Sequence, residues 1–332
     1  MLMTSVDRRF RLGLLFAVGS AISFGLSGPF AKALMTAGWT PTAAVTARLA
    51  GGALVLAVYA SLVRPGWIGE ALRHYRTVLP YGAFPIAGAQ LGYYNAVEHL
   101  SVGVALLLEY TSPVLVVGWV WAVTRRRPAN RTLVGVALAV VGIMLVLNVF
   151  SAAHINTVGV VWGLVAAVCA ACYFLMSARV DDRPDGPGLN PLSLAAGGLV
   201  VGAVGVALLG VTGVMPLRFT ANDVVVAGIT TSWIVPVIVL AVFSTAVAYT
   251  LGIKAVALLR PSFASLVGLS EVLAAVLWAW LLVGEAMTPV QAVGGAVVLA
   301  GLALARTTAT APAGAGSTEP GQIAALPDTS TR

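Results

Sequence analysis

Charged side chains are scarce in this sequence. They make up only 9% of the 332 residues, whereas 59% are hydrophobic and the mean hydropathy is +0.95. A soluble domain carries about 25% charged residues, because its surface has to stay hydrated. The shortage therefore excludes a soluble globular protein and indicates an integral membrane protein.

Cysteine and histidine are also rare, and catalytic motifs are missing. Both cysteines, Cys169 and Cys172, lie in one apolar segment, so no disulfide framework is expected. Their spacing occurs in redox and metal sites, but no further ligands lie beside them, and the three histidines fall in loops or at segment ends. The sequence has no His-Glu-x-x-His pattern and no Gly-Lys-Ser/Thr phosphate loop. We therefore expect no metal, no cofactor, no enzyme activity and no ATP-driven transport by this chain alone.

Ten apolar segments fill most of the chain, each of about the 20 residues that cross a bilayer as a helix. They are residues 12–32, 42–63, 78–97, 101–124, 132–150, 158–178, 191–213, 233–254, 261–283 and 287–305. No room remains for a soluble catalytic or nucleotide-binding domain. We expect residues 1–11 to be a basic cytoplasmic lead. Residues 307–332, rich in Ala, Thr, Gly, Pro and Ser, are expected to be a disordered cytoplasmic tail.

The net charge of +7 is distributed unevenly between the loops. Fifteen Lys and Arg residues fall on the side of the N-terminus, and only Lys32 and Arg218 fall on the other side. This positive-inside bias predicts a multi-pass protein of the plasma (inner) membrane with both termini in the cytoplasm. Because the basic residues set the topology, we expect no nucleic-acid binding. The first apolar segment is too long for a cleaved signal peptide and is expected to remain as an anchor.

The two halves of the sequence resemble each other. When the chain is slid along itself by 150 to 159 residues, aromatic residues, prolines and glycines align. The aligned pairs include Pro80 with Pro236, Tyr93 with Tyr249, Trp119 with Trp278, Trp121 with Trp280, Gly135 with Gly294, and Gly142 with Gly301. Residues 12–150 and 151–306 are therefore two copies of a five-segment unit, and because five is odd they insert with opposite orientation. Many secondary transporters have such inverted repeats and bind substrate near the midplane, although duplication can also build a purely structural bundle.

Several short motifs point to a known family. The second half contains Ser270-Glu271-Val272-Leu273, then Val283-Gly284-Glu285, and a glycine-rich last segment that starts near Gln291. Together with Ala47-Arg48-Leu49 in the second segment, these motifs resemble the drug/metabolite transporter superfamily, in its ten-span EamA-like branch. The resemblance covers nearly all of residues 10–306 as two EamA repeats.

Two features of the motifs are not repeated. Arg126 stands where the second half has Glu285, and Val272 replaces the proline found at Pro113. Residues Val102 to Pro113 resemble the threonine/homoserine exporter branch, which also has an acid before an aromatic residue and a proline. The family resemblance implies an all-α integral membrane fold of ten transmembrane helices, in two inverted five-helix repeats around a central cavity. It also implies alternating access and the export or import of small metabolites.

Two acids lie within apolar segments, where an ionisable side chain is costly and is most often functional. Glu109 stands about 12 Å along the fourth segment, and Glu271 lies near the middle of the ninth. The slide of 159 residues places Glu271 on Ser112, nearly one turn after Glu109, so the pseudo-twofold brings both acids toward one central space. Glu109 can exchange a proton or bind a substrate ammonium group; the alternative for both acids is a structural pairing with another helix. A third acid, Glu285, is expected to cap the tenth helix.

Arg48 lies in the second segment at a depth close to that of Glu109. We expect an ion pair between them, because pairing offsets the burial of both charges. Direct binding of an anionic group by Arg48 is the alternative.

Amide and aromatic side chains are further candidates for substrate contact. They are Gln90, Tyr93, Tyr94, Asn95, Tyr110, Tyr173 and Tyr249. Tyr93 and Tyr249 are aligned by the repeat. For Tyr94 and Asn95 the alternative is the aromatic belt at the membrane interface.

These features predict a secondary, non-ATP transporter of small polar metabolites that works by alternating access. We expect an exporter of amino acids or related amines, either proton-coupled or facilitative. Its partners are then a small-molecule substrate, the lipid bilayer and protons, and it acts as a monomer or homodimer. The alternative is a flippase for a lipid-linked or amphiphilic substrate, and a structural or receptor role is a third possibility.

Overall fold

The structure is a computed structural model that describes residues 2–125, 127–147, 156–181, 189–259, 267 and 269–309. Nearly all of these residues are helical, because a chain in lipid has to satisfy its backbone hydrogen bonds internally. The first half contains α1 Leu2–Gly25, α2 Ser27–Thr36, α3 Pro41–Val63, α4 Trp67–Arg73, α5 Tyr75–Tyr81, the π-helical η1 Gly82–Gly88, α6 Ala89–His99, α7 Val102–Glu109, α8 Ser112–Thr124 and α9 Asn130–Val146. The second half contains α10 Thr157–Asp181, α11 Pro191–Val211, α12 Ile234–Ile238, the π-helical η2 Val239–Val247, α13 Ala248–Leu258, α15 Ser270–Val283 and α16 Pro289–Ala309.

Every predicted apolar segment coincides with helical structure. Within the described residues, five stretches are long and apolar enough to cross a membrane: Arg9–Thr36, Pro41–Val63, Val102–Thr124, Pro191–Val211 and Ile234–Leu258. Four shorter apolar helices match the fifth, sixth, ninth and tenth predicted segments, and α5, η1 and α6 form the third. The prediction of ten membrane helices is therefore confirmed. The tail was predicted to begin at residue 307, but residues 307–309 belong to α16. The rest of the tail, the end of the fifth segment, 148–150, and the start of the ninth, 261–266, lie outside the described residues.

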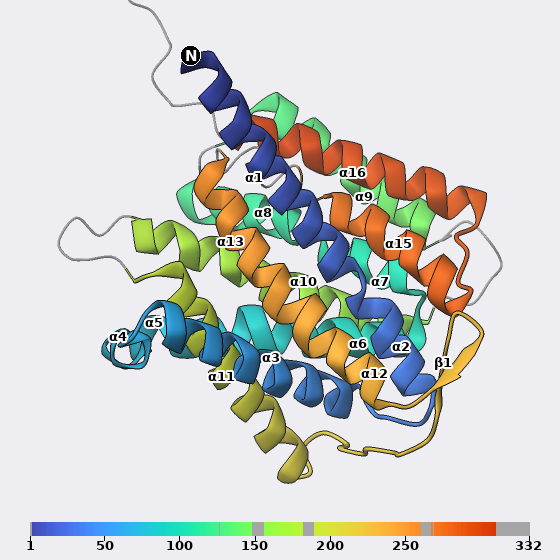
Figure 1. Ribbon diagram of the computed structural model, residues 1–332. Helices are drawn as coiled ribbons and strands as arrows, with labels where there is room; N and C mark the ends of the chain where they lie inside the picture. Colours follow the sequence, from blue (N-terminus) through green and yellow to red (C-terminus); the bar gives the residue numbers. More distant parts are fainter. Residues whose placement is uncertain are drawn as a thin grey trace, which may run out of the picture.

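The helices form two bundles that each draw on both halves of the sequence. In the first, which we call the α1 bundle, α1 and α2 pack with α13 and α15; in the second, the α10 bundle, α10 packs with α6, α7 and α8. Figure 1 shows α1 lying beside α13. Exchanging the first and second repeat converts one bundle into the other. Between them, α3 packs against α11, and each contacts the π-helix of the opposite repeat.

The crossing of α9 and α16 reveals the same twofold at residue level. These two helices lie side by side along one edge of the molecule (Figure 1). A Cβ added to Gly135 would lie 2.5 Å from the carbonyl oxygen of Gly301, and one added to Gly142 would lie 2.7 Å from that of Gly294. Because the repeat aligns Gly135 with Gly294 and Gly142 with Gly301, these are the same contact seen twice. The inverted repeat is therefore confirmed.

Both repeats carry a π-helix at the equivalent place. Pro80 precedes η1 and its repeat partner Pro236 precedes η2. The slide of 156 residues that aligns these prolines also places η1 on residues 238–244, which lie almost wholly within η2. A proline lacks the N–H of a regular helix, and π-helical turns are frequent at functional sites.

One element departs from the all-α prediction. A two-stranded hairpin, β1 Val224–Val226 and β2 Ile229–Thr231, follows α11. Its strands are rich in β-branched residues, and Ala227 and Gly228 between them both have positive φ, as a two-residue hairpin turn requires. The Ala227 N–H donates to the carbonyl of Leu282 at 2.7 Å, which fixes the hairpin against the end of α15.

Candidate functional site

Arg48 is the centre of a polar cluster that joins the two repeats. It lies on α3, which begins after the N-cap Thr40 and Pro41, and only 2% of the residue is exposed. Its guanidinium donates from Nε to Thr245 Oγ1 at 3.1 Å, from Nη2 to the Ser244 carbonyl at 3.0 Å, and from Nη1 to Gln90 Oε1 at 2.6 Å, to Tyr94 OH at 3.2 Å and to Ser27 Oγ. One arginine thereby connects α2, α3, α6 and η2.

The π-helix η2 supplies two of these acceptors. Thr245 accepts from Arg48 and donates its own hydroxyl proton to the carbonyl of Leu240 at 2.8 Å, inside the π-helix. Gly52 on α3 faces the Thr245 side chain so closely that a Cβ there would collide with it. A glycine at this position lets α3 approach η2, which brings Arg48 within reach of its partners.

The ion pair that the sequence predicts between Arg48 and Glu109 is not formed. Among the described residues no carboxylate pairs with Arg48, and every acceptor around it is neutral. The physical reason is that hydroxyl, amide and carbonyl oxygens from α2, α6 and η2 already surround the guanidinium.

Glu109 lies at a break in the fourth membrane segment. It is the last residue of α7, and α8 starts three residues later with Ser112 and Pro113. Pro113 lacks the N–H that the Glu109 carbonyl would accept in a continuous helix. The carboxylate is partly exposed, and among the described residues none gives it a hydrogen bond or an ion pair.

Glu271 is held by a residue of the other repeat. It occupies the first turn of α15, where the positive end of the helix dipole favours an acid. The hydroxyl of Tyr110, which directly follows Glu109, donates to Glu271 Oε2 at 2.8 Å. The structure therefore brings Glu109, Tyr110 and Glu271 together, but it gives the two acids different surroundings.

Of the remaining predicted residues, some lie beside Arg48 and others make contacts away from it. Tyr94 is buried against Arg48, and its neighbour Tyr93 is also buried, with ring centroids 5.8 Å apart. Asn95 donates to the Leu91 carbonyl of its own helix at 2.7 Å, and Tyr249 packs edge-on against Phe24 with ring centroids 5.2 Å apart. The side chain of Tyr173 lies outside the described part of the chain.

Comparison with known protein families gives a match in each half of the chain. The model of the EamA-like transporter family matches residues 11–148 and again residues 157–307. The chain belongs to this family. It is therefore a multi-pass membrane transporter, with a small-molecule substrate and the lipid bilayer as its partners.

Individual relatives agree with the EamA-like assignment. The chain is 24% identical over 300 residues to the inner membrane transporter YicL of Salmonella typhimurium (strain LT2), covering 89% of this chain and 95% of YicL. It is 27% identical over 262 residues to the threonine/homoserine exporter RhtA of Escherichia coli (strain K12), covering 77% of this chain and 78% of RhtA. A solved crystal structure with 17% identity matches with a TM-score of 0.54, over 88% of this chain and 96% of that one, and shares the fold.

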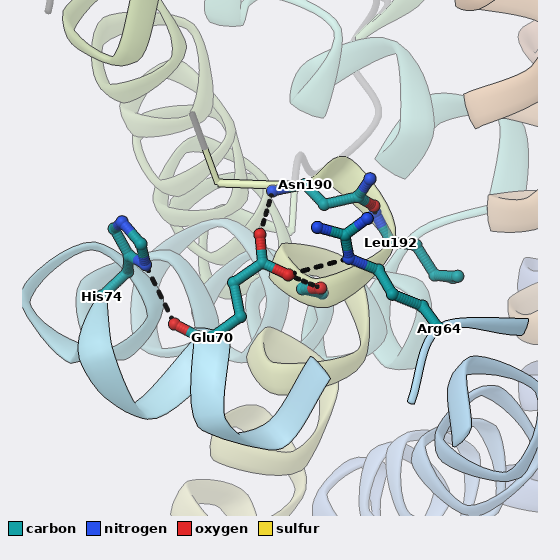
Figure 2. Close-up of polar contacts among 6 residues, drawn as sticks. Arg64, Glu70, His74, Asn190 and Leu192 are labelled. Carbon is teal, nitrogen blue, oxygen red and sulfur yellow. Dashed lines mark hydrogen bonds and ion pairs between the residues drawn. The ribbon is translucent and has the colours of Figure 1, made fainter. Parts of the chain in front are cut away.

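Sequence reasoning missed a second polar cluster of this EamA-like protein, at the end of the bundle near α4. Figure 2 shows Glu70 of α4 directed at the start of α11. Its Oε1 accepts from the Asn190 N–H at 2.8 Å, and its Oε2 accepts from Ser193 Oγ at 2.7 Å and from Arg64 Nε at 2.9 Å. The Arg64 guanidinium, above all, lowers the pKa of the Glu70 carboxyl from its ordinary value of 4.5 to about 2. No pattern in the sequence links Asn190, at the start of α11, to Glu70, which lies 120 residues earlier.

The opposite end of the bundle has its own contact between the repeats. Lys32 of α2 pairs with Glu285 Oε1 at 3.5 Å, and Glu285 Oε2 accepts from the Val102 N–H at 2.8 Å. Glu285 therefore caps α7. The sequence analysis expected it to cap the tenth helix, and that prediction was wrong. The tenth helix is capped reciprocally by Thr288 and Gln291, whose side chains accept from each other's backbone N–H. We refer to the two ends as the Lys32 end and the Glu70 end.

Proposed function

We propose that this EamA-like protein exports amino acids or closely related amines across the plasma (inner) membrane by alternating access, with proton exchange at Glu109. The observation that carries the proposal is the contrast between the two acids. Glu271 receives a hydrogen bond from Tyr110, whereas Glu109 receives none from the described residues. An acid without a fixed donor inside a membrane bundle is free to accept a proton or a substrate ammonium group. The likeness to RhtA favours amino acids as the substrate class.

The packing of the two bundles supports a state that is open at the Glu70 end. At the Lys32 end, α2 and α15 of the α1 bundle contact α6 and α7 of the α10 bundle. In the described chain, α1 and α13 make no comparable contact with α8. Along the fourth membrane segment, residues 102–108 are buried and residues 118–125 are exposed. Glu109 lies at the boundary.

The orientation of the protein follows from its basic residues. Arg64, Arg73 and Arg76 all lie at the Glu70 end, and positive residues favour the cytoplasmic side. We therefore place this end, with both chain termini, in the cytoplasm. In this orientation the open side gives Glu109 access to cytoplasmic substrate, as an exporter requires.

Transport by the purified protein in proteoliposomes tests the proposal. We expect at least one substrate from a panel of amino acids and amines to move faster than in empty vesicles, and to respond to an imposed pH gradient. If nothing in the panel moves, the proposed function is wrong. If labelled lipids were scrambled while no amino acid or amine moved, a flippase would replace it.

A further inference from the structure

Gln90 differs from the other partners of Arg48 in its exposure. The other four partners are each at most 5% exposed: Ser27, Tyr94, Ser244 and Thr245. A ligand therefore cannot reach them unless the protein rearranges. Gln90 is only half-buried. It is therefore the one partner through which a ligand can approach the guanidinium.

The hydrogen bonds of Arg48 also leave room for a ligand. Three acceptors compete for the two hydrogens of Nη1: Ser27, Gln90 and Tyr94. At any moment one of the three therefore lacks a full hydrogen bond from Nη1. Ser27 and Tyr94 are 3.1 Å apart and can bond each other instead. At Nη2 the described residues accept only one of the two hydrogens, through the Ser244 carbonyl. Releasing Gln90 would thus leave Ser27, Tyr94 and the Ser244 carbonyl with partners, while the Ser244 hydroxyl has none among the described residues even with Gln90 in place.

A buried guanidinium without a counter-ion is an unusual arrangement. Burying a charge is costly unless an opposite charge accompanies it, and a carboxylate adds the attraction of opposite charges to its hydrogen bonds with the guanidinium, which the neutral amide oxygen of Gln90 cannot supply. An arriving carboxylate would therefore displace the amide oxygen of Gln90. Its planar pair of oxygens also fits the fork of an arginine.

We propose that Arg48 is a carboxylate subsite in which Gln90 Oε1 holds the place of the substrate's carboxylate oxygen. The inference rests on the proposed transport function and narrows its substrate class. Arg48 provides a positive pole, and the helix α6 that carries its partner Gln90 packs against α7, which ends at the acid Glu109. The substrate is then a zwitterion with both a carboxylate and an ammonium group, and an amine without the carboxylate is a poor substrate.

A matched pair of substrates tests this selectivity in proteoliposomes. L-Threonine and 1-amino-2-propanol differ only by the carboxylate. We expect kcat/KM for threonine to exceed that for the amine at least tenfold in the wild type. If both compounds move equally well, or only the amine moves, transport stands and the carboxylate subsite is wrong. If neither these two nor any other amino acid or amine moves, the transport function itself is wrong, and the subsite with it.

Two substitutions at Gln90 should act in opposite directions. Gln90→Glu places a permanent carboxylate on Arg48, so KM for threonine should rise at least tenfold and the preference over the amine should disappear. Gln90→Met keeps the length but removes the competing oxygen, so KM should fall. Glu98→Gln, at an exposed site at the far end of the same helix, is the control and should leave both values unchanged. A purely structural brace at Arg48 predicts instead that both Gln90 variants change KM for the two compounds alike, and that result would overturn the proposal.

Discussion

Glu109 and Arg48 have opposite surroundings although both lie inside the membrane bundle. Arg48 is enclosed by neutral acceptors from both repeats, whereas the Glu109 carboxylate has no donor among the described residues. The arginine is thereby fixed in position, and the acid remains available for chemistry. A fixed positive group and a free acid are what a site needs if it is to orient a substrate and exchange a proton.

Tyr110 provides a test of the link between the two repeats. Tyr110→Phe removes the 2.8 Å bond to Glu271 and leaves the ring in place. A hydrogen bond to a charged group is worth about 1.5–3 kcal/mol, so we expect transport to fall about tenfold or more. Tyr59→Phe, on a half-buried tyrosine of α3, is the control. An unchanged rate in purified Tyr110→Phe would show that this bond has no role in the cycle.

At the scale of elements, the contact between α9 and α16 depends on glycine. At Gly142 an added Cβ would meet the backbone oxygen of Gly294 at 2.7 Å, and backbone cannot turn aside as a side chain can. Gly142→Ala should therefore destabilise the protein by about 1–3 kcal/mol, as overpacking does. Gly118→Ala on α8 is the control, because nothing lies within 4 Å of its added Cβ. Thermal unfolding in detergent measures both; equal stability of the two variants would contradict the close crossing.

The cluster around Glu70 makes a prediction about pH. Its pKa is lowered from 4.5 to about 2, so its contribution to stability is complete above pH 4.5 and is lost as the pH falls toward 2. Glu70→Gln should cost about 1–2 kcal/mol at pH 7, because a partly exposed ion pair and a helix cap are both weakened. The difference from wild type should shrink as the pH is lowered through this window.

Glu98→Gln is again the matched control, since Glu98 is exposed and its nearest basic atom, His99 Nε2, lies 3.9 Å away. Denaturation curves between pH 7 and pH 3 give the comparison. A Glu70→Gln variant whose deficit is the same at every pH would show that the ionised carboxylate is not what stabilises the start of α11.

At the scale of the whole molecule, the helices of the two repeats follow the pseudo-twofold symmetry, but the side chains of the polar site do not. The repeat places Arg48 opposite Gly198, and there the side chains of Tyr81 and Ile86 fill the space. Among the described residues, the positive pole at this site therefore comes from the first half alone. Two similar halves allow the bundles to exchange roles, while a single arginine gives the site one preferred orientation for its substrate.

The sequence predicted the architecture and the meeting of the acids, but not their partners. Hydrophobic length and the aligned Gly135, Gly142, Gly294 and Gly301 were enough for ten helices in an inverted repeat, because both signals are local or periodic. The neutral surroundings of Arg48 depend on η2, nearly 200 residues away, and on the carbonyl that its π-helical turn exposes. A periodic pattern in the sequence cannot predict that a backbone carbonyl so far along the chain will accept a hydrogen bond from Arg48. An ion pair was therefore the simplest expectation, and it was wrong.

Locking the Lys32 end should stop transport. A Cβ added to Gly103 on α7 lies 2.9 Å from Val276 Cγ2 on α15, which joins the two bundles. We expect Gly103→Cys with Val276→Cys, in a background with Cys169→Ala and Cys172→Ala, to form a disulfide under oxidation. Transport should then fall to the level of empty vesicles and return on reduction. The two single variants are the controls, and full activity of the oxidised double variant would contradict alternating access by separation of the bundles.

The most direct test of the central claim is the accumulation of an amino acid substrate in proteoliposomes under an imposed pH gradient, compared between wild type and Glu109→Gln. Wild-type protein should accumulate substrate against its gradient. Glu109→Gln should lose at least nine-tenths of this accumulation while Glu98→Gln retains it, because among the acids that the structure describes Glu109 alone combines a membrane position with the absence of a fixed donor from a described residue. Equal accumulation by wild type and Glu109→Gln at all pH values would show that Glu109 does not couple protons to transport.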